Sequence, residues 1–139
     1  MSDEKTYGSF EEFWPEYVRA HASKTNRTLH FVGTTMAMAC LGSAVVFRKP
    51  SLLLLAPVLG YGPAWIGHFF IEHNKPATFK NPIYSLRGDL RMWLKTLDGS
   101  MDAEVERMLA MTDEAAAQEP PKAHEKPEAR VPAESATAN

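Results

Sequence analysis

Two long apolar segments dominate the pattern of hydrophobic and polar positions along the chain. Residues 29–47 and residues 52–71 contain no Asp, Glu, Lys or Arg, and each holds one histidine. Each segment is close to the ~20 residues that a helix needs to cross ~30 Å of hydrocarbon, at ~1.5 Å per residue. Since only residues 48–51 separate them, the pattern predicts two spans that form a tight antiparallel helical hairpin.

A soluble bundle with two fully buried helices is the alternative interpretation. A chain of 139 residues has little other sequence with which to surround two helices that are apolar on every face. Pro57 and Pro63 in the second segment are better tolerated in membrane helices than in soluble ones. Small residues that suit close helix packing in lipid recur along both segments: Gly33, Ala37, Gly42, Gly60 and Gly67. We therefore expect an all-α, membrane-embedded fold.

Both flanks of the hairpin predict amphipathic helices. Ser9 followed by Glu12 is a capping-box pattern, and apolar residues then recur at helical spacing from Phe10 to Val18. The segment after the second span carries an apolar stripe, formed by Ile83, Leu86, Leu90, Trp93, Leu94 and Leu97. A helix that lies in the membrane interface and a helix packed against the hairpin would both show this stripe. Residues 101–111 predict one more short helix.

The polar C-terminal segment, residues 112–139, contains four prolines and no aromatic residue. Such a composition buries too little apolar surface to offset the entropy of ordering the chain. The sequence therefore predicts one helical membrane domain, residues 1–111, followed by a disordered tail that includes His124.

Charge and cysteine content narrow the function classes. The net charge of −2 gives no support for a nucleic-acid partner, and a single cysteine, Cys40, excludes an internal disulfide and a cysteine-rich zinc module. The two segments that flank the hairpin carry more Lys and Arg residues than the hairpin loop does. Because positively charged segments tend to stay in the cytoplasm, we expect both termini on the cytoplasmic side. The expected location is a bacterial inner membrane, or the endoplasmic reticulum of a eukaryote. The oligomeric state is left open.

Four of the five histidines should meet at one end of the hairpin. The hairpin turns near residue 49, so His30 and His68, nineteen residues before and after it, lie at the same depth. His21 precedes the first span and His73 follows the second. All four should therefore gather at the cytoplasmic end of the hairpin. Ionisable groups at membrane depth are costly and usually mark a functional site.

The expected local geometry indicates which of these four histidines can face one metal ion. A turn at Thr25 and Asn26 would let His21 and His30 face one point. Glu72 shares a helix face with His68, whereas His73 joins the group only if the helix ends near it. Imidazoles with a carboxylate suit iron, zinc or copper, and this set favours oxygen-activating non-haem iron without excluding zinc. We predict a site of His21, His30, His68 and His73, with Glu72 competing with His73 for the last place.

The sequences around these histidines also resemble a known family. Residues 13–34 (FWPEYVRAHASKTNRTLHFVGT) and residues 67–93 (GHFFIEHNKPATFKNPIYSLRGDLRMW) are similar to the small membrane proteins related to the fungal 2-hydroxy fatty acid dioxygenase. The resemblance covers about residues 9–97. The family's motifs map onto His21, Asn26, His30, Gly67, His68 and Glu72.

The resemblance implies an iron(II)-dependent dioxygenase that removes one carbon from 2-hydroxy long-chain acids during breakdown of phytosphingosine. We expect the acid to enter from the bilayer and react with O2 at the iron. Arg87 or Arg91 would pair with its carboxylate. Glu72 is a candidate catalytic residue, and Asp89 is either an acceptor for a histidine N–H or a solvated helix residue.

Three other functions stay open at this point. A zinc-dependent membrane lipid hydrolase would use the same ligands. A haem-binding protein would use two of the histidines as axial ligands. A structural membrane protein would use them for packing or pH sensing.

Overall fold

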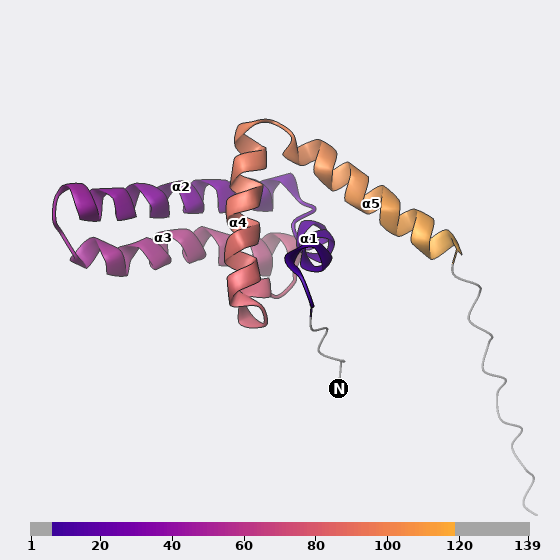
Figure 1. Ribbon diagram of the computed structural model, residues 1–139, viewed down its shortest axis with the longest axis horizontal. Coiled ribbons are helices and arrows are strands. Elements are labelled where there is room, and N and C mark those ends of the chain that lie inside the picture. Colours follow the sequence, from indigo (N-terminus) through magenta and orange to yellow (C-terminus); the bar gives the residue numbers. More distant parts are fainter. Residues whose placement is uncertain (1–6, 119–139) are drawn as a thin grey trace, which may run out of the picture.

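The computed structural model describes residues 7–118, and this part of the chain is helical and contains no strand (Figure 1). The all-α prediction is confirmed. The elements in chain order are α1 (Phe10–Arg19), α2 (Lys24–Val46), α3 (Ser51–Ile66), the π-helix η1 (Gly67–Glu72), the 3₁₀-helix η2 (Ala77–Phe79), α4 (Pro82–Leu97) and α5 (Met101–Gln118).

The two apolar segments form the predicted hairpin, in which α2 and α3 lie side by side and antiparallel (Figure 1). Glycines set their separation: a Cβ added at Gly33 would lie 2.7 Å from the carbonyl oxygen of Gly60. The residue at the turn, Arg48, has a left-handed backbone with φ 52°. Helices Lys24–Val46 and Ser51–Glu72 are long and apolar enough to cross a membrane.

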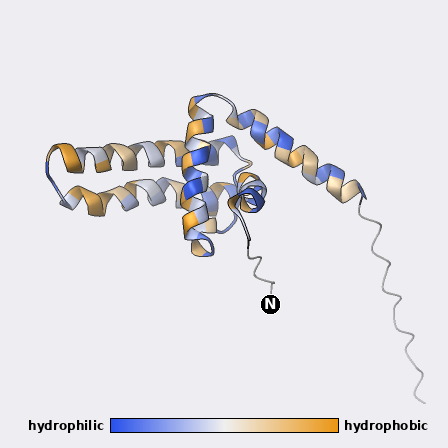
Figure 2. Ribbon diagram, in the orientation of Figure 1, coloured by the Kyte–Doolittle hydropathy of each residue, from blue (hydrophilic) through white to orange (hydrophobic). Residues whose placement is uncertain are grey.

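Most of the apolar surface of this hairpin is not buried by the rest of the chain. In the most apolar stretch of each helix only 22% of the residues are buried. Val45 and Leu54, near the turn, are 76% and 79% exposed, and Figure 2 shows the apolar residues gathered toward that end. The core helix of a soluble protein is usually mostly buried, whereas these two helices leave most of their apolar surface exposed.

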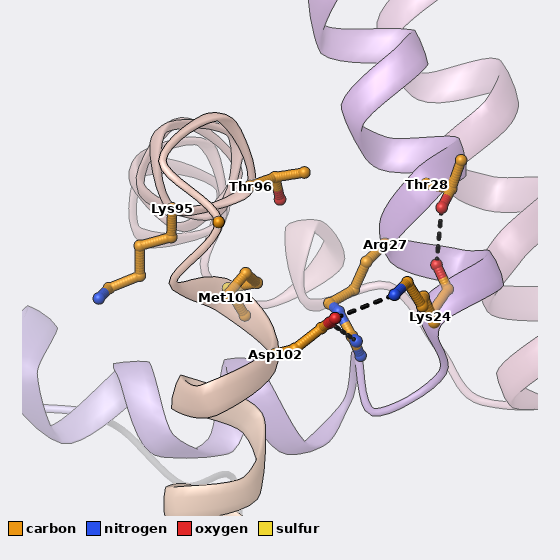
Figure 3. A pocket seen from close by; sticks show the side chains of 8 residues that line it. Lys24, Arg27, Thr28, Lys95, Thr96, Met101 and Asp102 are labelled. Atoms are coloured by element: carbon orange, nitrogen blue, oxygen red, sulfur yellow. Dashed lines mark hydrogen bonds and ion pairs between the residues drawn. The ribbon is translucent and has the colours of Figure 1, made fainter.

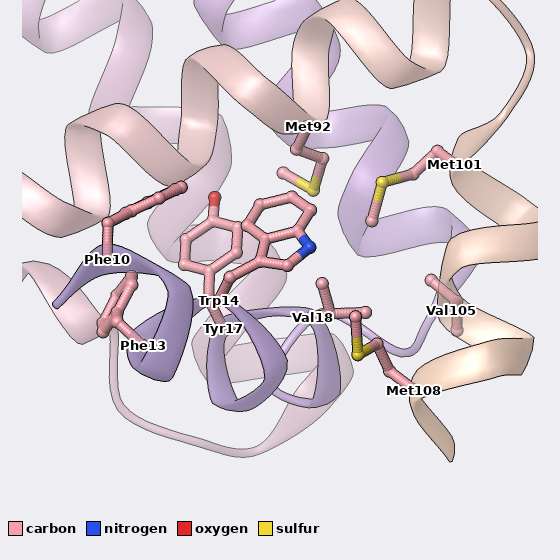
Figure 4. Packing of buried hydrophobic residues seen from close by; sticks show 9 residues of the cluster. All are labelled: Phe10, Phe13, Trp14, Tyr17, Val18, Met92, Met101, Val105 and Met108. Carbon is pink, nitrogen blue, oxygen red and sulfur yellow. The ribbon is translucent and has the colours of Figure 1, made fainter. Parts of the chain in front are cut away.

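The buried apolar core lies at the other end, between α1, α4 and α5 (Figure 4). Helix α1 begins after Ser9, whose Oγ accepts a hydrogen bond from the Glu12 N–H as the capping pattern predicts. The face of α1 that the sequence marked as apolar supplies most of the core. The cluster consists of Phe10, Phe13, Trp14, Tyr17, Val18, Met92, Met101, Val105 and Met108.

Helix α4 runs across both helices of the hairpin (Figure 1). Trp93 attaches it to α2, with its ring stacked on Phe31 and its N–H donating to Thr35 at 2.9 Å. The other stripe residues remain 42–79% exposed: Ile83, Leu86, Leu90, Leu94 and Leu97. Of the two interpretations of the apolar stripe, packing against the hairpin therefore accounts for Trp93 alone. The other residues of the stripe are not covered by the hairpin.

Helix α5 extends past residue 112, where the sequence predicts that the disordered tail begins. The helix continues to Gln118, because residues 114–118 (EAAAQ) are strong helix formers. Thr112 donates to the Met108 carbonyl and accepts from the Arg19 guanidinium, which fixes this turn against α1. The remainder of the predicted tail, with His124, lies outside the described residues.

Candidate metal centre

Three of the four predicted histidines meet in the interior. His21 lies in the turn between α1 and α2, His30 on α2 and His68 on η1, and their exposed fractions are 0%, 5% and 2%. The Nε2 atom of His30 is 3.2 Å from the Nε2 of His21 and 3.2 Å from the Nε2 of His68. A single ligand atom from each ring lies within 4.8 Å of the other two.

The turn that delivers His21 comes earlier than the sequence predicts. Helix α1 ends at Arg19 and α2 begins at Lys24, so Asn26 lies in the first turn of α2. Its side chain is fully buried against Gly67, where an added Cβ would lie only 1.9 Å from the Asn26 Oδ1. The absence of a side chain at Gly67 therefore brings the start of α2 and the histidine-bearing η1 together.

The second nitrogen of each ring has an oxygen partner. The Nδ1 of His21 is 2.6 Å from the Tyr17 carbonyl oxygen, and the Nδ1 of His30 is 3.0 Å from an Asp89 carboxylate oxygen. The Nδ1 of His68 is 2.7 Å from the Oδ1 of Asn74, whose amide group donates to the Ala20 carbonyl. Since all three partners are acceptors, each Nδ1 carries the proton and donates it.

With Nδ1 protonated, each neutral imidazole presents a lone pair on Nε2. Three such lone pairs converge in a buried space, so they repel one another unless a cation lies between them. Two nitrogens ~2.1 Å from one ion lie ~3.0–3.4 Å apart for angles at the ion between square and tetrahedral. The observed 3.2 Å falls within this range. The three imidazoles, oriented by outer hydrogen bonds, fit a transition-metal ion.

Comparison with protein families decides what kind of chain this is. Residues 7–101 match the family model described as 2-hydroxy-palmitic acid dioxygenase Mpo1-like. The chain belongs to the Mpo1-like family. The resemblance that its histidine motifs suggested is thereby confirmed. No curated protein and no solved structure gives a significant match.

The part of the chain that matches the Mpo1-like family carries the whole cluster and its hydrogen-bond partners. His21, His30, His68 and Asp89 all lie within residues 7–101. Most of α5, which begins at Met101, lies beyond the match. The histidine cluster and the hairpin are therefore the part of this protein that belongs to the family.

Electrostatics favour the metal-binding form of His21. Burial lowers its pKa well below the usual range, and the neighbouring His30 and His68 lower it further. The ring is thus held neutral, as ligation requires. Burial raises the pKa of Tyr17, as does the charge of Asp89, so the phenol stays protonated and donates to that carboxylate.

Tyr17 and Asp89 form a second layer around the cluster. The same Asp89 oxygen accepts a hydrogen bond from the Tyr17 hydroxyl and lies 3.0 Å from the Nδ1 of His30. The Tyr17 ring stacks on His21 with 4.1 Å between ring centroids. A Cβ at Gly88 would lie 2.8 Å from that ring, so glycine there lets Tyr17 reach Asp89.

Replacing Asp89 with asparagine should lower metal affinity about 10- to 100-fold, because the neutral amide weakens the hydrogen bond that orients and polarises His30. Titration of the apo protein with iron(II) or zinc measures the change. Asp113→Asn, on an exposed turn of α5, is the matched control and should leave the affinity unaltered. Equal affinities for the two variants would contradict the role given to Asp89.

The structure does not bring Glu72 and His73 into the cluster. One Glu72 oxygen accepts from the Ser23 backbone N–H at 2.6 Å and lies 3.5 Å from the Asn26 amide nitrogen, so it caps α2. His73 is exposed and has a left-handed backbone with φ 53°. The sequence reading assumed an α-helix, in which residues i and i+4 share a face, whereas η1 is a π-helix and turns Glu72 away.

Glu72→Ala should therefore reduce stability without removing metal. Loss of the part-buried acceptor for the Ser23 N–H costs about 1 kcal/mol, while the three histidines keep their partners. Thermal unfolding and metal analysis of the same sample separate the two effects, and Glu72→Gln, which retains an acceptor oxygen, should lie between. A metal-free but stable Glu72→Ala protein would show that Glu72 is a ligand.

The two arginines expected to bind the substrate carboxylate face α1 instead. The Arg87 guanidinium lies 4.2 Å from the Phe10 ring centroid, and that of Arg91 lies 4.5 Å from the Trp14 ring. Arg91 also pairs with Glu11 at 3.2 Å. Both side chains are thus used to attach α4 to α1 by cation–π contacts, and neither lines the cavity at the metal centre.

That cavity lies between α2, α3 and α4 and has a volume of about 480 Å³. His30 and Asp89 form part of its wall, so it is continuous with the histidine cluster. Most of the other lining residues are apolar, and its size lies within the ~300–1,000 Å³ of small-molecule sites. Thr34 and Tyr61 add two hydroxyl groups.

The sequence reading missed four residues around the site. Tyr17 precedes His21 by four residues, and Thr34 follows His30 by four, so helical spacing alone could have singled out both. Asn74 and Tyr61 gave no such signal in the sequence. The position of Asn74 depends on the π-helix η1 that precedes it, and Tyr61 lies on α3, the second helix of the hairpin.

A smaller cavity of about 190 Å³ lies where α2, α4 and α5 meet (Figure 3). Arg27 in its wall donates to the carbonyls of His21 and Ala22 and pairs with Asp102 at 2.6 Å. Lys24 pairs with the same carboxylate at 3.0 Å. This side of the structure therefore attaches α5 to the turn that carries His21.

Proposed function

We propose that this protein is an iron(II)-dependent dioxygenase that shortens 2-hydroxy long-chain fatty acids by one carbon at a membrane. The observation that carries the proposal is the convergence of three buried Nε2 atoms whose rings all donate through Nδ1. The name of the Mpo1-like family supplies the substrate class and the use of O2.

In this proposal, His21, His30 and His68 hold the ion. When bound, iron(II) supplies the redox chemistry by which O2 reacts with an organic acid. The chain's own residues prepare that site: Tyr17, Asp89 and Asn74 fix the three rings through their Nδ1 hydrogen bonds.

The 480 Å³ cavity would bind the substrate next to the ion. Its apolar walls exclude water and accept the acyl chain. The hydroxyls of Thr34 and Tyr61, at the polar end, are placed to donate to the carboxylate in the role first expected of the arginines. The 2-hydroxyl and the carboxylate then lie beside His30.

The hairpin would span the membrane twice. The exposed apolar surface of α2 and α3 and the exposed stripe of α4 need a cover that the described chain does not supply, and lipid is suited to both. The excess of Lys and Arg in the flanks favours a cytoplasmic metal centre. In a Cys40→Ser background, an impermeant maleimide added outside intact cells should label Ser51→Cys and spare Ser100→Cys; the reverse pattern would overturn the orientation.

The distances within the cluster argue against the haem alternative. A haem ring has to lie between its two axial histidines. The Nε2 of His30 lies 3.2 Å from that of each other histidine, so neither pair that includes His30 leaves room for a haem ring.

Oxygen uptake by purified protein tests the function. Protein in phosphatidylcholine nanodiscs, loaded with iron(II) without air, should consume O2 when 2-hydroxypalmitate is added and release pentadecanoate. Palmitate, which lacks the 2-hydroxyl, is the matched control and should cause no uptake. Protein that isolates with zinc and hydrolyses lipids without O2 would replace this proposal with a zinc hydrolase.

A further inference from the structure

Of the three clustered histidines, His21 is the one that lies outside a helix. It follows α1 in a turn at residues 20–23, whereas His30 and His68 lie within α2 and η1. A residue inside a helix is held by the repeating backbone hydrogen bonds around it, but a residue in a short turn depends on contacts from elsewhere in the chain. The position of the His21 ring in the cluster therefore depends on what holds this turn.

The side chain of Arg27 holds the turn by its backbone. One guanidinium nitrogen, Nη1, donates to the carbonyl oxygen of His21 at 3.0 Å and to that of Ala22 at 2.5 Å. The other, Nη2, donates to the Asp102 carboxylate on α5 at 2.6 Å. Arg27 is only 6% exposed, and a planar guanidinium donates in fixed directions. The carboxylate on one side therefore determines where the N–H groups on the other side point.

We propose that Asp102 is a positioning residue for the metal centre: through Arg27, it holds the turn that presents His21 to the ion. The inference rests on the metal binding in the proposed function and is independent of the reaction with O2. Asp102 lies beyond residues 7–101, the part of the chain that matches the Mpo1-like family, and the family description assigns no role to it.

The charge of Asp102 is what makes this contact strong. Hydrogen bonds from Lys24 and Arg27 hold the pKa of Asp102 below its ordinary value, so the carboxylate is ionised between two cations (Figure 3). A buried guanidinium that loses its carboxylate retains a costly unpaired charge. The adjacent cavity of about 190 Å³, which Arg27 lines, gives the guanidinium room to turn away from the two carbonyls. Neutralising Asp102 should therefore loosen the His21 turn.

A second acidic residue of α5 is connected to the ring of His21 rather than to its backbone. Glu104, which is 7% exposed, accepts a hydrogen bond from the indole N–H of Trp14 at 2.7 Å. The Trp14 ring stacks on Tyr17 with 5.6 Å between ring centroids, and Tyr17 in turn stacks on His21 (Figure 4). Helix α5 thus reaches this one ligand by two routes, of which the ion pair of Asp102 is the more accessible to substitution.

Asp102→Asn tests the proposal against Glu106→Gln, a matched control that removes the same charge from an exposed position on the same helix. The full-length apo proteins in phosphatidylcholine nanodiscs are titrated with zinc in competition with a chromophoric chelator. Asp102→Asn should bind zinc about 2- to 30-fold more weakly than the wild type, the range for residues that act on a site through others. Glu106→Gln should match the wild type, and Asp102→Glu, which retains the carboxylate, should recover most of the affinity.

Hydrogen exchange in the wild type provides a second measurement that needs no variant. Coupling between two sites is reciprocal, so zinc bound at the histidines should slow amide exchange in α5. Equal zinc affinities of Asp102→Asn and Glu106→Gln, or exchange in α5 that zinc leaves unchanged, would overturn the proposal. Neither measurement uses O2, so a failure of the dioxygenase assay does not affect them. A wild type that binds no zinc would reject the metal centre and this proposal together.

Discussion

His30→Ala should abolish stoichiometric metal binding, with affinity lowered at least about 100-fold. His30 supplies the central Nε2, 3.2 Å from both other ligand atoms, so its removal leaves two donors that no longer enclose one point. Since outer-layer changes alone cost about 10- to 100-fold, loss of a direct ligand costs at least as much. Elemental analysis of protein purified in mild detergent measures the effect, and O2 uptake should disappear with the metal.

His73→Ala is the matched control for this experiment. His73 is five residues from His68 and is exposed outside the cluster. Its replacement should leave metal content and activity unchanged. Metal loss in His73→Ala, or full occupancy in His30→Ala, would contradict the three-histidine centre.

Gly67→Ala should destabilise the protein by about 3 kcal/mol, because overpacking at a site without free space costs this much. The new Cβ would lie 1.9 Å from the Asn26 Oδ1, and Asn26 is itself fully buried and cannot move aside into solvent. Helix α2 or η1 must shift, which also displaces His30 or His68. The midpoint of thermal unfolding measures the loss, and metal affinity should fall in the same variant.

Gly62→Ala provides the control for Gly67→Ala on the same stretch of helix. A Cβ at Gly62 has no atom within 4 Å, so alanine there should be neutral or stabilise the helix by up to about 1 kcal/mol. Equal unfolding temperatures for the two variants would show that η1 and α2 are not held at the distance described here.

The spacing of apolar residues was enough to predict the hairpin and the meeting of His30 and His68. Equal distances from the turn place His30 and His68 at one depth whichever way the helices rotate, so this prediction needed no side-chain detail. The position of His21 was harder to predict, because it depends on a turn at residues 20–23. That turn is stabilised by a hydrogen bond between Ser23 and Glu72, which are far apart in the sequence.

The errors have physical causes that a single sequence does not reveal. A π-helix at Gly67–Glu72 changes which residues share a face with His68, and nothing in GHFFIE distinguishes it from an α-helix. The role expected of Arg87 assumed that basic residues of α4 face the ligand. The aromatic face of α1 attracts those cations instead, and this depends on how two separate helices dock.

The three candidate ligands come from separate segments of the fold. His30 and His68 lie on the two arms of the hairpin, whereas His21 follows α1, which packs on α4 and α5. An ion held by all three histidines would therefore link the hairpin to the peripheral helices. Without an ion this link would be absent, and α1 and α5 should then be cut faster than the hairpin in limited proteolysis of the metal-free protein.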